Sequence, residues 1–374
     1  MAGCYVLQIR NIALILGPQG SAVRKKRVSI AHVAERAGVS SMTVSRVLRC
    51  EPRVRPETRA RVVEIMRELG YVPSVAAQSL RSNNHLTQSG ARLFALIFGR
   101  GTETSVSFFH DIARGVERSA SGFGLCPIQV TMQEDPQDSW LRLQTVLSID
   151  SLCGALLVGQ FSEEDIRFVR DRAHNVVVLD APAPQGDGIG SVESGYLEGS
   201  LLALDYLMQV GCRRILVLTV FRDSYFARSM EAAAEARGAA EAQIEVLFDC
   251  LSSQDAHDVV LARWNAGQRC DGIFTNDEFA VGALRALSEL GVAVPQQVRI
   301  VGFDDIHYAS FTIPSLSSVR IDKHLLGAEA VRTLVALIES PERASSIKKT
   351  IRPSLIVRDS TGGIPFAAQA GGKQ

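Results

Sequence analysis

The sequence predicts a small all-α head with a helix-turn-helix motif, followed by an α/β body of two doubly wound parallel-sheet lobes. Near the N-terminus, apolar residues recur at helical spacing in three short stretches. Beyond residue 91, short apolar runs alternate with longer amphipathic stretches, as strands and helices do around parallel sheets. The length of 374 residues suits two or three domains, and 46% hydrophobic residues are ordinary for a globular protein.

Charge is distributed unevenly along the chain, although the formal net charge is zero. Residues 24–81 contain 13 Lys and Arg but only five Asp and Glu, and residues 82–374 carry the balancing negative charge. A basic head on an acidic body is typical of a protein that holds a polyanion at one end. The charge alone is weak evidence, because most charged stretches are solvated surfaces.

Residues 1–26 are expected to be a disordered extension; for residues 1–22 the alternative is that an upstream start codon was chosen in error and that they are not translated. The apolar run Ile12–Leu16 is shorter than the roughly 7–15 residues of a signal-peptide core. No run approaches the roughly 18 apolar residues that cross a bilayer. The seven Cys form no CxxC pair, so neither a zinc ribbon nor a disulfide framework is indicated. A cytoplasmic protein without membrane contact is therefore expected.

The head begins at Ser29, which is placed to cap a helix predicted over residues 30–37. Apolar positions 30, 33, 34 and 37 form one stripe, and Gly38 ends the helix. Ser40 caps a second helix over residues 41–48, and Pro56 suits the first turn of a third helix. Two short helices joined by a glycine-containing turn form the motif that inserts its second helix into the major groove of DNA.

The second helix carries the side chains that are expected to read DNA. They are Ser41, Met42, Thr43, Ser45, Arg46 and Arg49. The hydroxyl groups suit phosphates or base edges, and Arg46 can bond guanine in a bidentate way or hold a phosphate. For Arg46 and Arg49 taken singly, a solvated arginine without DNA contact is the alternative.

Residues 28–48, 56–59 and 69–73 resemble the head of the lac/galactose repressor (LacI/GalR) family. The resemblance continues through Val301–Asp305 and covers roughly residues 27–358. It implies a DNA-binding domain over residues 27–73, a hinge helix and linker over 74–90, and a tail over 361–374. Between them, over residues 91–360, it implies a two-lobed domain for effector binding and dimerisation that is similar to periplasmic binding proteins.

The resemblance also extends the predicted DNA contacts. It adds Ser29 and Ser40 in the head, and Ala77 and Leu80 in the hinge helix, where Leu80 matches a leucine that wedges into the minor groove. Apolar wedges of this kind unstack a base step and bend the duplex.

The body is predicted to start with strands over residues 93–98, 128–132, 155–158 and 176–179, and with helices over 109–120 and 140–149. A second unit begins near residue 189, with helices over 197–210, 226–236, 256–266 and 279–290 and strands over 215–219, 245–248, 272–274 and 299–302. Two such units with right-handed crossovers imply two similar lobes. The resemblance implies further that the chain crosses between the lobes three times, that the lobes clamp a small ligand, and that the protein is a homodimer.

Polar residues follow the predicted strands, where parallel sheets bind ligands. Asp180, Asn276 and Asp304 each come just after a predicted strand. Arg228, Asn276 and Asp304 also match ligand-contacting residues of the family. Carboxylates and amides around one crevice suit a hydroxyl-rich ligand such as a sugar. For Asp180, Asn276 and Asp304, the alternative role is to cap loops or helices.

Three positions depart from the family's pattern. Val106-Ser107 precedes the paired phenylalanines, Ser194-Gly195 replaces a usual Asp-Asn, and no sugar-stacking aromatic residue occurs near residues 250–253. Enzyme motifs are missing as well: the sequence has no phosphate-binding loop, no nucleophile elbow and no HxxxH pair. Neither catalysis, nor a cofactor, nor a metal is therefore expected.

The sequence thus predicts a transcriptional repressor of carbohydrate-related genes, which binds a pseudo-palindromic operator as a homodimer and responds to a sugar. It leaves open whether the effector releases or strengthens DNA binding. A sugar-binding protein of the periplasmic type is the rival class. The head and the missing export signal argue against that rival.

Overall fold

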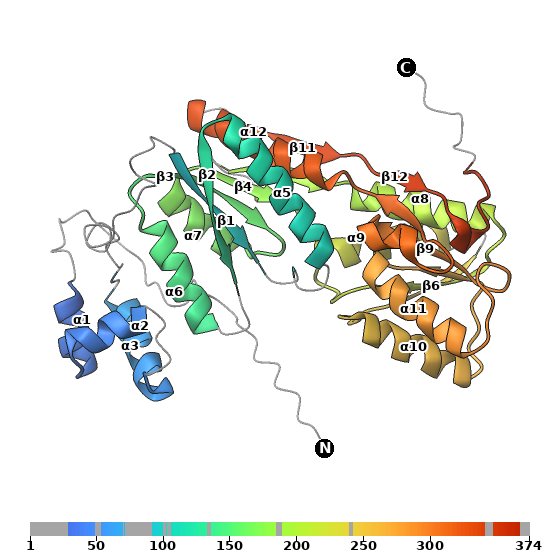
Figure 1. The fold of residues 1–374 in the computed structure, drawn as a ribbon, viewed down its shortest axis with the longest axis horizontal. Coiled ribbons are helices and arrows are strands. Elements are labelled where there is room, and N and C mark those ends of the chain that lie inside the picture. Colours follow the sequence, from blue (N-terminus) through green and yellow to red (C-terminus); the bar gives the residue numbers. More distant parts are fainter. Residues whose placement is uncertain are drawn as a thin grey trace.

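The computed structural model describes residues 29–48, 54–69, 71, 92–99, 102, 106–132, 136–184, 189–238, 242–340 and 347–366. They form a helical head and two α/β lobes, which follow one another along the long axis of the molecule (Figure 1). The predicted extension, Arg49 and the predicted hinge helix with Ala77 and Leu80 lie outside these residues. Within them, no helix combines the length and the apolar character needed to cross a membrane.

The head contains α1 (Ile30–Ala37), α2 (Ser41–Leu48) and α3 (Pro56–Glu68). Ser29 caps α1 as predicted, because its hydroxyl accepts a hydrogen bond from the backbone N–H of His32. Gly38 ends α1 with a φ of 63°, a left-handed conformation that glycine adopts without strain. The hydroxyl of Ser40 accepts from the N–H of Thr43 at 3.1 Å and so caps α2.

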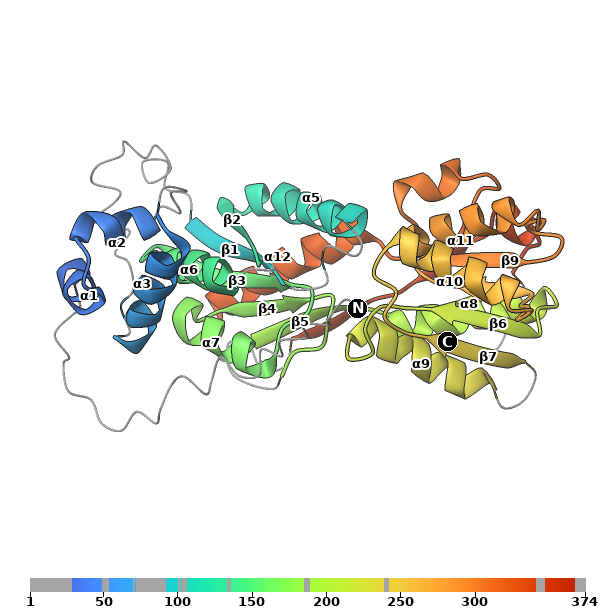
Figure 2. The same ribbon diagram turned by 90° about the horizontal axis from the view of Figure 1, so that it is seen from below.

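The core of the head is small and mostly aliphatic. Its buried residues are Val33, Ala34, Ala37, Val44, Val47, Val62, Val63, Met66 and Tyr71. Three of the four positions in the predicted α1 stripe are therefore buried, while Ile30 packs at the edge of the cluster. Trp140 and Leu141 of α6 (Pro136–Leu147), in the first lobe, complete this core. Figure 2 shows α3 beside α6.

The first lobe is built on a six-stranded parallel sheet. In spatial order its strands are β11 (Lys348–Ile351), β5 (Ile189–Ser194), β4 (Val176–Leu179), β3 (Leu152–Val158), β1 (Arg92–Phe98) and β2 (Leu125–Thr131). Along β1, Phe94 and Leu96 pack toward α5 (Val106–Gly122) and α12 (Lys323–Glu339). The alternate residues Ala95 and Ile97 pack toward α6 and α7 (Glu163–Ala173).

The second lobe repeats this plan. In spatial order its strands are β12 (Ser354–Ile356), β10 (Ser317–Arg320), β9 (Arg299–Asp304), β8 (Gly272–Phe274), β6 (Arg214–Leu218) and β7 (Gln243–Leu247). Its main helices are α8 (Tyr196–Gln209), α9 (Tyr225–Gly238), α10 (Ser253–Asn265) and α11 (Asp277–Glu289), with short 3-10 turns η3 (His307–Phe311) and η5 (Asp359–Thr361). The pairing is parallel except at the edge, where β12 runs antiparallel to β10. The sequence pattern predicted parallel-sheet lobes and did not predict this antiparallel edge strand, which the chain adds without a crossover helix.

Every strand and helix predicted for the body is present, with ends shifted by a few residues. The sequence pattern missed α7, α12, β10, β11 and β12. The last two strands have only four and three residues, which is too short for a periodic signal. The missed α12 is buried over much of its surface, so it lacks a clear polar face.

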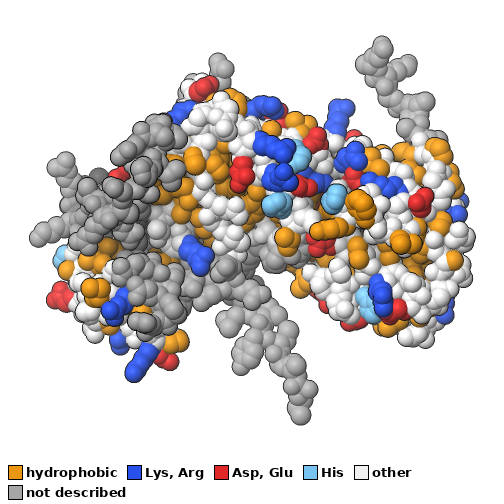
Figure 3. All heavy atoms as spheres, viewed as in Figure 1, with side chains coloured by type: hydrophobic (Ala, Val, Ile, Leu, Met, Phe, Trp, Pro, Cys, Tyr) orange, Lys and Arg blue, Asp and Glu red, His pale blue; other side chains and the backbone are white. Residues whose placement is uncertain are grey.

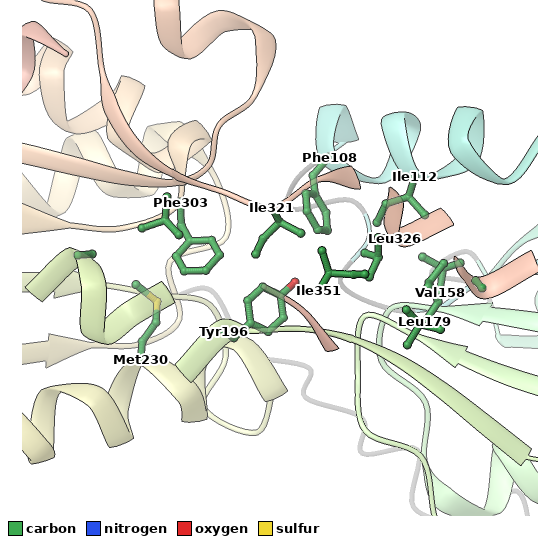
Figure 4. Packing of buried hydrophobic residues seen from close by; sticks show 14 of the residues in the cluster. Phe108, Ile112, Val158, Leu179, Tyr196, Met230, Phe303, Ile321, Leu326 and Ile351 are labelled. Carbon is green, nitrogen blue, oxygen red and sulfur yellow. The ribbon is translucent and has the colours of Figure 1, made fainter. Parts of the chain in front are cut away.

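The chain passes between the lobes three times, from β5 to α8, from β10 to α12 and from β11 to β12. One hydrophobic cluster continues through this junction, from Leu96 in the first sheet to Tyr206 in the second lobe. Figure 4 shows Phe108, Tyr196 and Phe303 at the passage between the lobes. The two lobes therefore share a core and are not merely tethered.

Gly282 lies where α10 and α11 are in close contact. A Cβ atom at this position would lie 1.9 Å from the carbonyl oxygen of Ser253 on the neighbouring helix. We expect Gly282→Ala to lower the free energy of unfolding by about 1–3 kcal/mol, because the two backbones must move apart. Urea unfolding measures this, with Ser288→Ala on the exposed side of α11 as the control. Equal stability of the two variants would contradict the close packing.

Candidate functional site

The exposed face of α2 carries the side chains predicted to read DNA. Ser41, Met42 and Arg46 are exposed, and 58% of the Met42 surface is accessible. Thr43 and Ser45 are half-buried. The valines at positions 44 and 47 lie on the opposite side of the helix and are fully buried. The pattern thus separates a buried core face from a solvent-exposed face.

Ser29 and Ser40 both have a local role in the head. The Ser29 backbone N–H and hydroxyl also lie within hydrogen-bond distance of Nδ1 of His32, at 3.2 and 3.0 Å. The Ser40 hydroxyl lies 3.0 Å from the hydroxyl of Thr43. These caps orient the N-termini of α1 and α2, whose free N–H groups favour phosphate oxygens. DNA contact by these two serines stays a prediction, as it does for the residues on α2.

A cavity of about 180 Å³ lies between the two lobes. It is lined by all four predicted effector residues, Asp180, Arg228, Asn276 and Asp304. Asp180 directly follows β4, and Asp304 is the last residue of β9. Asn276 follows β8 by two residues, and Arg228 lies in the first turn of α9. The carboxyl ends of the strands in both sheets therefore meet at one cavity, as parallel α/β sheets predict.

Asp180 is buried, with 6% of its surface exposed, and both carboxylate oxygens are hydrogen-bonded. One oxygen accepts from the hydroxyl of Ser194 at 2.5 Å, and the other from the hydroxyl of Tyr196 at 2.6 Å. Burial raises the pKa of Asp180 to about 7; the negative charge of Asp304 also raises it, whereas the two hydrogen bonds lower it. Asp180 therefore ties β4 to the end of β5 and the start of α8, in addition to lining the cavity.

Asp304 lies on the second lobe, with 5% of its surface exposed and a φ of 100°. Asp and Asn tolerate positive φ better than most residues. The ammonium of the buried Lys323 donates hydrogen bonds to the backbone carbonyls of Asp304 and Asp305, which holds this turn in place. Burial, followed by the charge of Asp304, raises the pKa of Asp277 well above its ordinary range. The second lobe thus brings several carboxyl groups close to the cavity.

Asn276 caps a helix, which was the alternative to ligand binding for this residue. It also lines the cavity. Its side-chain oxygen accepts from the N–H of Phe279 at 2.8 Å and caps α11. Only 3% of the surface of Asn276 is exposed. Arg228, by contrast, is exposed, so a ligand can reach its guanidinium group from the solvent side.

The aromatic wall of the cavity was not predicted from the sequence. Its members are Phe108, Phe109, Phe161, Tyr196, Phe221, Tyr225 and Phe226. Phe161 and Phe221 each lie three residues beyond a strand, so the rule that selected Asp180 would also have found them. In residues 250–253, which contain no aromatic residue, Leu251 and Ser252 are exposed.

Tyr196 connects the aromatic wall to the core at the lobe junction. Its ring centroid lies 4.9 Å from that of Phe226 and 5.5 Å from that of Phe303, in edge-on and tilted geometries. Its hydroxyl reaches Asp180 across the junction. The side chain therefore belongs at once to the second-lobe core and to the cavity.

Other kinds of site find little support in the parts of the chain that the structure covers. No three His, Cys, Asp or Glu side chains among those residues are grouped as metal ligands. On the face drawn in Figure 3, basic, acidic and apolar side chains are interspersed over the two lobes. Over the two lobes on that face, no broad area carries charged side chains of one sign alone.

Two family models match the chain. Residues 29–74 match the model described as "Bacterial regulatory proteins, lacI family". Residues 204–361 match the model described as "Periplasmic binding protein-like domain". The first covers the described head, and the second covers most of the second lobe together with α12 and the last strands.

Relatives match nearly the whole chain. The HTH-type transcriptional repressor PurR of Edwardsiella ictaluri (strain 93-146) is 30% identical over 352 residues, covering 90% of this chain and 98% of the relative. The HTH-type transcriptional regulator AscG of Escherichia coli (strain K12) is 29% identical over 355 residues, covering 89% and 98%.

Solved structures agree with the fold. The lac repressor dimer bound to operator and the anti-inducer ONPF superposes with a TM-score of 0.61 at 24% identity, covering 90% of this chain and 99% of that chain. A complex of the transcriptional regulator CelR with cellobiose gives a TM-score of 0.63 at 25% identity, covering 89% and 100%.

The carboxyl group of Asp180 makes the stability of the protein depend on pH. Its pKa rises from the ordinary 3.8 to about 7 on folding, so the folded state binds this proton more tightly. The resulting stabilisation is complete below about pH 4 and is lost as the pH rises to about 7, by up to about 4 kcal/mol. We expect the parent protein to lose stability relative to Asp180→Asn over this range, as measured by urea unfolding. A difference that stays constant between about pH 5 and pH 7.5 would contradict the raised pKa.

Proposed function

The chain belongs to the LacI family of bacterial transcriptional regulators, and we propose that it is a repressor of carbohydrate-related genes whose effector is a sugar. Proteins of this family are DNA-binding regulators with an effector-binding domain, not enzymes. In this proposal the head binds a pseudo-palindromic operator as a homodimer, and the sugar binds in the cavity between the lobes.

The exposed face of α2 supports the DNA-binding part of the proposal. Ser41, Met42 and Arg46 point away from the core of the head and are accessible to base edges. In a homodimer, two α2 helices would enter successive major grooves about 34–36 Å apart, which matches a pseudo-palindrome. Contacts from the basic head to phosphates would supply affinity that falls with salt, while base contacts would supply specificity.

An exposed apolar segment in the second lobe supports dimerisation. Tyr308, Phe311 and Ile313 have 60%, 69% and 96% of their surfaces exposed. These residues lie within or just after η3. Three large apolar side chains so exposed within six residues fit a protein interface better than a solvated surface.

The observation that carries the effector proposal is that polar side chains from both lobes surround one cavity. Asp180 comes from the first lobe, whereas Arg228, Asn276 and Asp304 come from the second. Sugars present hydroxyl groups that suit carboxylates, amides and guanidinium, and C–H faces that suit aromatic rings. A sugar bonded to both lobes would favour one arrangement of the lobes, and it would change DNA affinity by its differential affinity for the two states, typically about 1–3 kcal/mol.

A purine base is the second candidate for the effector. Seven aromatic rings line the cavity, and planar ligands stack on such rings. The 30% identity to a repressor named PurR points the same way. Asn276 and Asp304 can bond either a base edge or a sugar hydroxyl, so binding experiments must separate the two classes.

Selection of DNA from a random pool tests the proposed function. The purified protein is mixed with the pool at roughly physiological salt, alone and with sugars or purine bases, and the retained DNA is sequenced. We expect an enriched palindrome whose recovery changes with one of the sugars. A palindrome that responds only to a purine would overturn the sugar assignment. Retention without sequence preference under every condition would overturn the proposal of a specific repressor.

Arg46 is the residue of α2 best suited to a bidentate base contact. We expect Arg46→Ala to weaken binding to the selected palindrome by about 1–3 kcal/mol and to relax the preference at one position of each half-site. Fluorescence anisotropy with labelled duplexes measures both effects. Arg61→Ala, an exposed arginine on α3, is the matched control and should not change the base preference. Unchanged affinity of Arg46→Ala would remove this side chain from the reading face.

Asp304 separates ligand binding from DNA binding. We expect Asp304→Asn to keep palindrome affinity within about twofold but to weaken the effector response by about tenfold or more, because a carboxylate accepts stronger hydrogen bonds from a ligand than an amide does. Asparagine is chosen because it also tolerates the positive φ at this position. Titration of the protein–DNA complex with effector measures the response. A variant that responds like the parent would show that this carboxylate does not bind the effector.

A further inference from the structure

α6 has two apolar faces, and different parts of the chain bury them. Leu143 and Leu147 pack into the core of the first lobe together with residues of α7. Leu141, which has 1% of its surface exposed, belongs instead to the core of the head. Trp140 packs against the same cluster. A helix on a soluble lobe does not need this second apolar face unless another element covers it.

The covering element is α3 of the head. The two helices are in contact, and Figures 1 and 2 both show α3 beside α6. From the head, Met66 and Tyr71 are buried in the cluster that includes Leu141, while Ile65 and Leu69 pack at its edge. The contact is therefore a continuous apolar core.

The contact with α6 leaves the predicted DNA-binding face of α2 exposed. Met42 and Arg46 remain exposed on α2 while α3 lies against α6. The contact therefore orients the head without blocking it. The core of the head is small, so the burial of Leu141 against it adds to its stability.

We propose that α6 is a docking site for the DNA-binding head, which holds α3 against the first lobe when no DNA is bound. The contact between α3 and α6 keeps the head folded. It also makes the head move together with the first lobe, which supplies Asp180 and Phe161 to the cavity. Pre-ordering of the head lowers the entropic cost of binding DNA. A change in lobe arrangement would then reach the head through packed side chains as well as through the connecting chain.

Hydrogen exchange of the full-length protein without DNA tests whether the head is held against α6. Leu141→Ser removes the apolar contact, and Arg142→Ser, at the exposed neighbouring position, is the matched control. We expect amides of residues 29–48 and 54–69 to exchange about tenfold or more faster in Leu141→Ser than in the control. Amides of β1, β3 and the second lobe should exchange at equal rates in both proteins.

A milder variant keeps the test decisive if Leu141→Ser destabilises the first lobe itself. Leu141→Ala should give a smaller acceleration of the same kind, again confined to the head. Head amides that exchange at the same rate in the parent, Leu141→Ala and Arg142→Ser would overturn the proposal. Acceleration spread equally over the head and the strands of the first lobe would also overturn it, because Leu141 would then belong to the lobe core.

Discussion

Parallel strand pairing positions the cavity and the elements around it in both lobes. Each parallel pair needs a crossover that returns the chain to the same edge of the sheet, so every loop that follows a strand lies at the opposite edge. In this chain the two such edges face each other. Asp180 and Phe161 from the first sheet therefore line the same cavity as Asn276 and Asp304 from the second. Residues more than 100 positions apart become neighbours because both lobes obey one topological rule.

The cavity and the junction between the lobes form one physical unit. Tyr196 is the first residue of α8, directly after the chain leaves the first sheet. Its ring packs on Phe226 and Phe303, while its hydroxyl donates to the buried carboxylate of Asp180. A carboxylate held in this way is sensitive to any change in its surroundings, since burial penalises its charge. A bound effector would act directly on the contacts that set the arrangement of the lobes.

The helices of the head are specified by local residues, but the core of the head depends on a contact with the first lobe. Its caps at Ser29 and Ser40 and its left-handed Gly38 arise from residues within a few positions of each other. Its core, however, is completed by Leu141 of the first lobe. The same module is thus recognisable on its own in sequence and incomplete on its own in packing. This combination suits a DNA-binding domain whose affinity is coupled to a distant cavity.

The helices of the head, their caps and most strands of the body could be predicted from the residue pattern, because periodicity and capping depend on residues close in the chain. The strand-end rule also selected Asp180, Asn276 and Asp304, because topology fixes where parallel strands end. Only the tertiary structure decided that Tyr196 bonds Asp180, that aromatic rings from separate loops form one wall, and that Leu141 joins the core of the head. These contacts join segments far apart in the chain, and their partners are chosen by the packing of whole lobes, which no local pattern of residues encodes.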